Sequence, residues 1–147
     1  MDTWQFIHHK LASSVEVILL YVLESKGSSP GRQGFHMAVA SDHSISGTIG
    51  GGIMEHKLVE LAKSILENNE PGNKLFKQVH DKSAIKDQSG MICSGEQTVF
   101  LYQVKQQEKE CMAALIKSLQ ENRNGTLYLS QSGIMFKEEK PGRDYLF

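Results

Sequence analysis

Apolar residues recur at helical spacing in three segments of the chain. A repeat of about 3.6 residues is typical of a helix that packs one face against a core. This spacing predicts helices over residues 1–12, 53–68 and 106–122. In the second of these segments the charged residues fall on the opposite side from the apolar stripe. We therefore expect three amphipathic helices, each covering part of a sheet.

Residues 15–23 differ from these segments because they are apolar on both faces of an extended strand. That pattern predicts a central strand covered by helices on both sides. Shorter alternating runs, separated by Gly, Ser, Asn and Asp, predict further strands and hairpins. These strands are expected over residues 35–40, 45–49, 74–80, 97–104, 126–130 and 134–137.

The elements together predict a mixed α/β fold. We expect a central sheet of about five to seven strands, mostly antiparallel at its hairpins and flanked by the three helices. The length of 147 residues suits a single domain, which we expect to span residues 1–147.

Charge and cysteine content narrow the function classes. Lys and Arg number 16 against 17 Asp and Glu, so the net charge of −1 argues against a general nucleic-acid-binding protein. Cys93 and Cys111 form no close pair, which favours a reducing cytoplasm over disulfide-stabilised secretion. No apolar run is long enough to span a membrane, and no signal peptide is recognised at the N-terminus. We expect a cytoplasmic protein without membrane contacts.

Three consecutive glycines, Gly50, Gly51 and Gly52, stand between a predicted strand and a predicted helix. Free N–H groups and the helix dipole at such a junction can bind an anion, so the run is a candidate glycine-rich anion-binding loop. The alternative is a tight turn without a ligand. The run matches neither the dinucleotide-binding nor the P-loop pattern, because Glu55 occupies a position that needs a small residue and no P-loop Lys is present.

Polar residues in two other loops are further candidates. Ser28, Ser29 and Arg32 follow the predicted central strand, and a guanidinium suits phosphate, although a Gly/Pro surface turn would have the same composition. Cys93 lies between two glycines just before a strand. It could act as a nucleophile, carry sulfur or ligate a metal, or it could be a small buried side chain.

Three motifs together resemble the XdhC/CoxI family, the xanthine dehydrogenase accessory proteins. They are Gly27-Ser28-Ser29-Pro30-Gly31-Arg32, Gly47-Thr48-Ile49-Gly50-Gly51-Gly52 with Glu55, and Gly90-Met91-Ile92-Cys93-Ser94-Gly95-Glu96. The resemblance covers about residues 15–104. Ser94 stands where the family usually has Gly. The family's second, Rossmann-like domain is not recognised in this sequence, so the resemblance is to the N-terminal domain only.

The resemblance implies a chaperone that binds molybdenum cofactor, assists its sulfuration and delivers it to a xanthine dehydrogenase-like molybdenum hydroxylase. It implies a carrier rather than a turnover enzyme. The client hydroxylase, and possibly a sulfur donor, would be its partners. The cofactor phosphate would lie at the three glycines, Glu55 would contact the pterin, and Cys93 would lie near the molybdenum or its sulfur. The residues expected to bind the cofactor are Ser28, Ser29, Arg32, Gly50, Gly51, Gly52 and Glu55.

Two alternatives remain open. The chain could be a thiol-dependent enzyme, with Cys93 as catalytic nucleophile and the glycines as an oxyanion or phosphate site. It could also be a structural or regulatory module whose glycines only form a turn. A homodimer is compatible with each of these functions.

Overall fold

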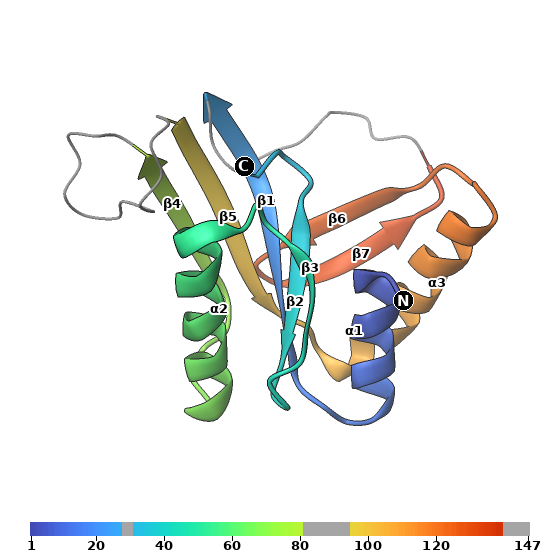
Figure 1. The fold of residues 1–147 in the computed structure, drawn as a ribbon. Helices are drawn as coiled ribbons and strands as arrows, with labels where there is room; N and C mark the ends of the chain where they lie inside the picture. Colours follow the sequence, from blue (N-terminus) through green and yellow to red (C-terminus); the bar gives the residue numbers. More distant parts are fainter. Residues whose placement is uncertain (28–30, 81–94, 140–147) are drawn as a thin grey trace.

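Strand β1 (Val17–Gly27) lies at the centre of a five-stranded antiparallel sheet (Figure 1). The structure is a computed structural model that describes residues 1–27, 31–80 and 95–139. The strand order is β3-β2-β1-β5-β4, so β1 is paired on both sides. The other strands of this sheet are β2 (His36–Ala40), β3 (Ile45–Thr48), β4 (Lys74–His80) and β5 (Gly95–Gln103).

Helices cover both faces of this sheet (Figure 1). Helix α2 (Gly52–Glu67) packs on one face, and α1 (Thr3–Ala12) and α3 (Lys109–Gln120) pack on the other. Alternate residues of β1 point to opposite faces of the sheet. Leu20 packs in the hydrophobic core beneath α2, and Leu19 packs in the core beneath α1 and α3; both are fully buried. Burying a Leu side chain contributes about 1.5–3 kcal/mol. The two-sided apolar pattern of β1 therefore follows from its place between the layers.

The last two strands form a separate two-stranded sheet beside α3 (Figure 1). Strand β6 (Thr126–Ser130) pairs antiparallel with β7 (Gly133–Lys137). A short 3-10 helix, η1 (Gln106–Glu108), leads from β5 into α3. Seven strands are therefore present in the described part of the chain, but they belong to two sheets.

The carboxylate of Glu108 fastens the small sheet to the rest of the domain. Its Oε2 accepts the backbone N–H of Ile134 in β7 at 2.6 Å, and its Oε1 accepts the backbone N–H of Lys105 at 2.8 Å. The hydroxyl of Tyr102 in β5 donates to the same carboxylate at 2.8 Å. Burial raises the pKa of Tyr102, and the adjacent carboxylate raises it further. Glu108 is only 7% exposed, and its hydrogen bonds compensate for that burial.

The predicted fold is confirmed: three helices flank an antiparallel sheet in a mixed α/β domain. The predicted hairpins also form, since β2 pairs with β3 and β6 with β7. The extent of the domain, residues 1–147, stays a prediction. Among the described residues, no helix has both the length and the apolar character needed to cross a membrane.

Candidate ligand-binding site

The ends of three strands and the start of a helix meet at one end of the large sheet (Figure 1). Gly27, the last residue of β1, pairs with Gly95, the first residue of β5. His80, the last residue of β4, pairs with Gly95 on its other side. Helix α2 begins at the same end, at the last of the three glycines. Antiparallel pairing therefore brings segments that are far apart in the sequence to one place.

The three glycines adopt backbone conformations that other residues rarely adopt. The φ angles of Gly50, Gly51 and Gly52 are 121°, 74° and 76°. Gly51 is the N-cap of α2 and has a ψ of −169°, a combination that is essentially restricted to glycine. As a glycine, Gly51 offers no side chain to cap α2, so the first N–H groups of the helix receive no hydrogen bond from the N-cap residue. The run thus provides the backbone geometry of an anion site at a 16-residue helix.

A threonine hydroxyl links the glycine run to the first turn of α2. Thr48 Oγ1 accepts the backbone N–H of Gly50 at 3.1 Å and donates to Glu55 Oε2 at 2.8 Å. The carboxylate of Glu55 is thereby held beside the helix N-terminus, where the dipole favours negative charge. Sequence analysis did not identify Thr48. Its position could have predicted this role, because the hydroxyl of a Thr two residues before a glycine turn often bonds to a nearby backbone N–H group.

A buried glutamine lies directly beneath this loop. Gln97 in β5 is fully buried, and its Nε2 donates to the carbonyl oxygen of Ile49 at 3.0 Å. A methyl group at Gly31 would collide with both that carbonyl oxygen and Gln97 Nε2, so only a glycine allows this close approach. Gly31 and Ile49 belong to two of the family motifs, and Gln97 directly follows the third. These contacts therefore join the three segments of the chain that carry the motifs. Gln97 was not among the predicted site residues, because a Gln at the start of a predicted strand gives no local indication of burial or binding.

The structure brings together most of the predicted site residues that it describes. Gly50, Gly51 and Gly52 form the loop, and Glu55 lies in the first turn of α2, as predicted. Arg32 is exposed, one residue after the Gly31 contact. The predicted residues Ser28, Ser29 and Cys93 lie outside the described residues. Their roles, including Cys93 as nucleophile or metal ligand, stay predictions.

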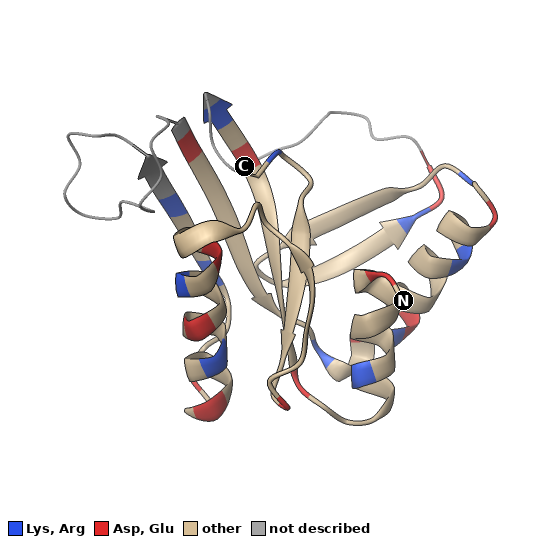
Figure 2. Ribbon diagram, viewed as in Figure 1, with Lys and Arg blue, Asp and Glu red and all other residues tan. Residues whose placement is uncertain are grey.

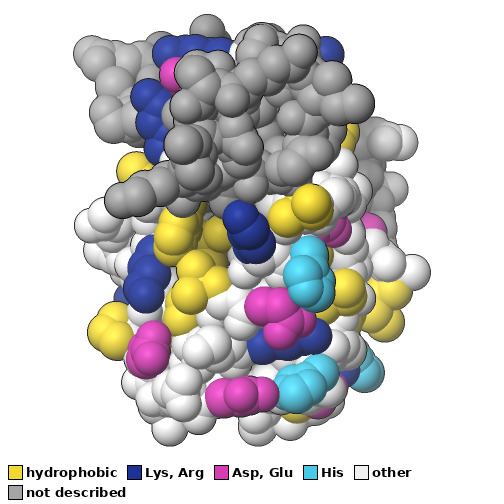
Figure 3. Space-filling model, turned by 60° about the vertical axis from the view of Figure 1, so that its left-hand side comes forward, with side chains coloured by type: hydrophobic (Ala, Val, Ile, Leu, Met, Phe, Trp, Pro, Cys, Tyr) yellow, Lys and Arg dark blue, Asp and Glu magenta, His cyan; other side chains and the backbone are white. Residues whose placement is uncertain are grey.

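Charged residues of both signs occur on the helices and at both ends of the large sheet (Figure 2). Two ion pairs occur at the end that carries the three glycines: Lys26 Nζ is 3.3 Å from Glu24 Oε1, and Lys77 Nζ is 3.4 Å from Glu96 Oε2. Figure 3 brings the α2 side forward and shows acidic, basic and histidine side chains intermixed. Neither sign of charge dominates the visible described surface, so selectivity here depends on individual groups rather than on a broad field.

Metal ligation is not organised among the described side chains. Within residues 1–27, 31–80 and 95–139, no three His, Cys, Asp or Glu side chains are close enough together to hold a metal ion. The described part of the site instead offers backbone N–H donors, a carboxylate and a carboxamide. Such groups bind a polar organic molecule or an anion.

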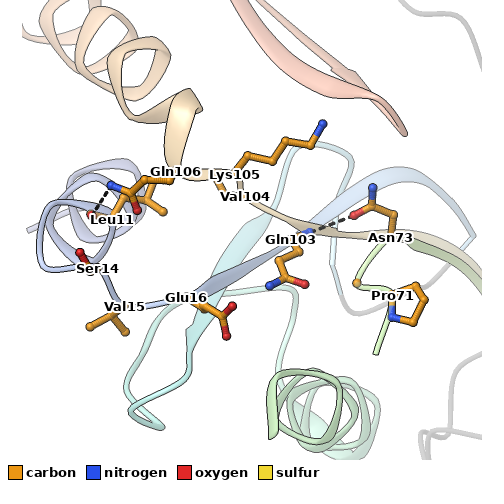
Figure 4. A pocket seen from close by; sticks show the side chains of 11 residues that line it. Leu11, Ser14, Val15, Glu16, Pro71, Asn73, Gln103, Val104, Lys105 and Gln106 are labelled. Atoms are coloured by element: carbon orange, nitrogen blue, oxygen red, sulfur yellow. Dashed lines mark hydrogen bonds between the residues drawn. The ribbon is translucent and has the colours of Figure 1, made fainter. Parts of the chain in front are cut away.

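A hollow of about 790 Å³ lies at the opposite end of the sheet (Figure 4). It is bordered by the residues before β1 and β4 and those after β5. Gln106 Nε2 donates to the carbonyl oxygen of Leu11 at 2.7 Å, and Asn73 Oδ1 accepts the backbone N–H of Gln103 at 3.1 Å. These side chains thus fasten neighbouring segments to one another. None of the predicted site residues lines this hollow.

The structure is thus an α/β domain with a candidate ligand site at one end of its large sheet. At this end, called the glycine-built end, the ends of three strands meet Gly50–Gly52 and the N-terminus of α2. Residues 11–78 match the model of the XdhC and CoxI family. This match confirms the resemblance to that family that the sequence motifs carry.

Two individual proteins are similar to the chain. The uncharacterized protein YqeB of Escherichia coli (strain K12) is 38% identical over 82 residues, which cover 54% of this chain and 14% of that protein. The crystal structure of a xanthine dehydrogenase from Bacillus halodurans has a similar fold, with a TM-score of 0.67 and 19% identity. That match covers 95% of this chain and 43% of the other, so this chain spans less than half the length of either protein. At this identity the structural match shows the fold alone.

Proposed function

We propose that this chain is a molybdenum-cofactor-binding accessory protein that assists the maturation of a xanthine dehydrogenase-type molybdenum hydroxylase. In this proposal it acts as a carrier in the cytoplasm, with the hydroxylase and a sulfur donor as partners. The observation that carries the proposal is the contact at one end of the sheet between Gly31 and Ile49, from two of the family motifs, and Gln97, which directly follows the third motif. The match of residues 11–78 to the model of the XdhC and CoxI family supports it.

The groups at this end are compatible with the cofactor, which carries a phosphate and a pterin rich in N–H donors. The first N–H groups of α2, after Gly51 and Gly52, would hold the phosphate. Exposed Arg32 would add a guanidinium. The Glu55 carboxylate, held by Thr48, would accept a hydrogen bond from the pterin. The cofactor supplies the redox chemistry of the client enzyme, and these residues would bind and orient it.

The position of Glu55 limits where a phosphate can lie. A methyl group at Gly51 would be 3.7 Å from Glu55 Oε2, so the carboxylate borders the same loop. Two anions side by side repel each other. The phosphate is therefore expected on the side of the loop that faces away from Glu55, and the pterin on the side that faces it. This division of the site distinguishes the proposal from an unspecific anion site.

A charge placed at Ile53 tests the phosphate position. Ile53 follows Gly52 in the first turn of α2 and is 51% exposed, so its replacement removes little core packing. Substitution of Gly51 would instead strain the backbone. We expect Ile53→Asp to weaken binding at least about tenfold, because its carboxylate repels the phosphate. The matched variant Ile53→Asn adds a side chain of the same size without charge and should bind within about threefold of the unmodified protein.

The measurement is an anaerobic titration of each purified protein with molybdenum cofactor, followed by the protein's fluorescence. Saturable binding that Ile53→Asp weakens and Ile53→Asn preserves would support the proposal. Equal binding by both variants would move the phosphate away from the glycine loop. If the unmodified chain shows no saturable binding, it is not a cofactor carrier by itself.

A further inference from the structure

The orientation of the buried Gln97 side chain is determined by its neighbour. Its amide group lies against the carbonyl oxygen of Ile49, with the nitrogen 3.0 Å away. A carbonyl oxygen can only accept a hydrogen bond, so the –NH₂ end must face it. The amide oxygen, Oε1, must therefore point away from Ile49. The assignment of the two amide ends follows from this contact.

Gln97 Oε1 is buried and has no hydrogen-bond donor among the described residues. Burying an acceptor without a donor is costly, and native proteins keep few such groups. The hydrogen bond to Ile49 explains why a buried side chain with an N–H donor is present here. It does not explain why the side chain also carries a buried oxygen without a donor. An apolar side chain would fill the same place without this cost. The free acceptor therefore calls for a donor that comes from outside the described chain.

The position of this acceptor connects it with the candidate site. Ile49, which holds the amide, directly precedes the glycine run, and Gly31 packs against both groups. Gln97 lies on the face of β5 that is covered by α2, as do Val99 and Leu101. The Gln97 amide is therefore a neighbour of the glycine run, and the Glu55 carboxylate lies in the first turn of α2 that follows this run.

We infer that Gln97 is a ligand-recognition residue whose Oε1 accepts a hydrogen bond from an N–H group of a fused nitrogen heterocycle. This inference rests on the proposed function, in which the heterocycle is the pterin of the cofactor. The exocyclic amine or a ring N–H is the donor. Because the amide is fixed at Ile49 before the ligand arrives, the acceptor is preorganised. A site that binds a donor in this way discriminates strongly against analogues that lack it.

Matched ligands provide the test. The probes are pterin, its 2-dimethylamino analogue, which lacks the exocyclic N–H donors, and 3-methylpterin, which lacks the ring donor. We expect the unmodified protein to bind pterin about tenfold more tightly than at least one methylated analogue. In Gln97→Met, which has a similar size but no acceptor oxygen, this preference should disappear. Gln103→Met, at the other end of β5, is the matched control and should keep it.

The outcomes separate this inference from the proposed function. If the unmodified protein binds molybdenum cofactor but does not discriminate between the pterins, the role of Gln97 is wrong and the carrier function stands. The same conclusion follows if Gln97→Met keeps the preference. If the unmodified protein binds neither the cofactor nor pterin, both are overturned. The comparison of ligands on the unmodified protein needs no substitution, so it remains decisive even if a variant folds poorly.

Discussion

The two ends of β5 each have a buried polar side chain nearby, but the two differ in how they are satisfied. Beyond the last residue of β5, the Glu108 carboxylate receives hydrogen bonds from Tyr102, Lys105 and Ile134. Near the first residue, Gln97 uses its nitrogen but leaves its oxygen without a donor among the described residues. A satisfied buried group indicates a structural role, whereas an unsatisfied one requires a separate explanation, for which we infer ligand binding at Gln97.

The hollow and the candidate ligand site lie at opposite ends of the large sheet. The cavity of about 790 Å³ lies at the Glu108 end of the sheet, where side chains fasten neighbouring segments. The glycine-built end contains the φ angles of 74° to 121° at Gly50, Gly51 and Gly52, and it contains the Gln97 oxygen that has no donor among the described residues. The unmet hydrogen bonding of Gln97 lies at the same end as Gly31 and Gly50–Gly52, which belong to two of the family motifs.

Removal of the satisfied group should have the largest effect on stability. Glu108→Leu leaves the Tyr102 hydroxyl and the backbone N–H groups of Lys105 and Ile134 without their acceptor. We expect the free energy of unfolding to fall by about 3–5 kcal/mol. Chemical denaturation measures it, with exposed Glu110→Leu as the control. A loss below about 1 kcal/mol would mean that the carboxylate does not hold the small sheet.

A methyl group at Gly31 should have an intermediate effect at the other end. Gly31→Ala places a Cβ against the Ile49 carbonyl oxygen and the Gln97 amide, neither of which can move freely. We expect a loss of about 1–3 kcal/mol in the free energy of unfolding. Gln33→Ala, an exposed position in the same loop, should change it by less than about 0.5 kcal/mol. Equal stability of the two variants would show that Gly31 is not packed in this way.

Replacement of the unsatisfied group should have the smallest effect on the free protein. Gln97→Met loses the hydrogen bond to Ile49 but also removes a buried acceptor that has no donor. Because these contributions oppose each other, we expect the free energy of unfolding to change by less than about 1 kcal/mol. The same denaturation experiment measures it. A loss comparable to that of Glu108→Leu would indicate that the Gln97 oxygen is satisfied in the folded protein.

The sequence predicted the order and type of the elements because local patterns encode them. Residues 15–23 are apolar on both faces, and β1 is indeed the central strand between two helical layers. The glycine run predicted a special backbone, and its φ angles of 74° to 121° explain why other residues would be strained there. Glu55 was placed correctly in the first helical turn, since it follows the glycines by only a few residues.

Only the tertiary structure decided which distant groups meet. The strands β6 and β7 form their own sheet, and Glu108, an acidic residue that its local sequence does not mark as buried, links that sheet to the rest of the domain. Gln97 becomes a free buried acceptor because β5 pairs with β1 and the Ile49 turn closes over it. These contacts join residues 26 to 48 positions apart. Local periodicity contains no information about such pairings, because they arise from the packing of whole layers.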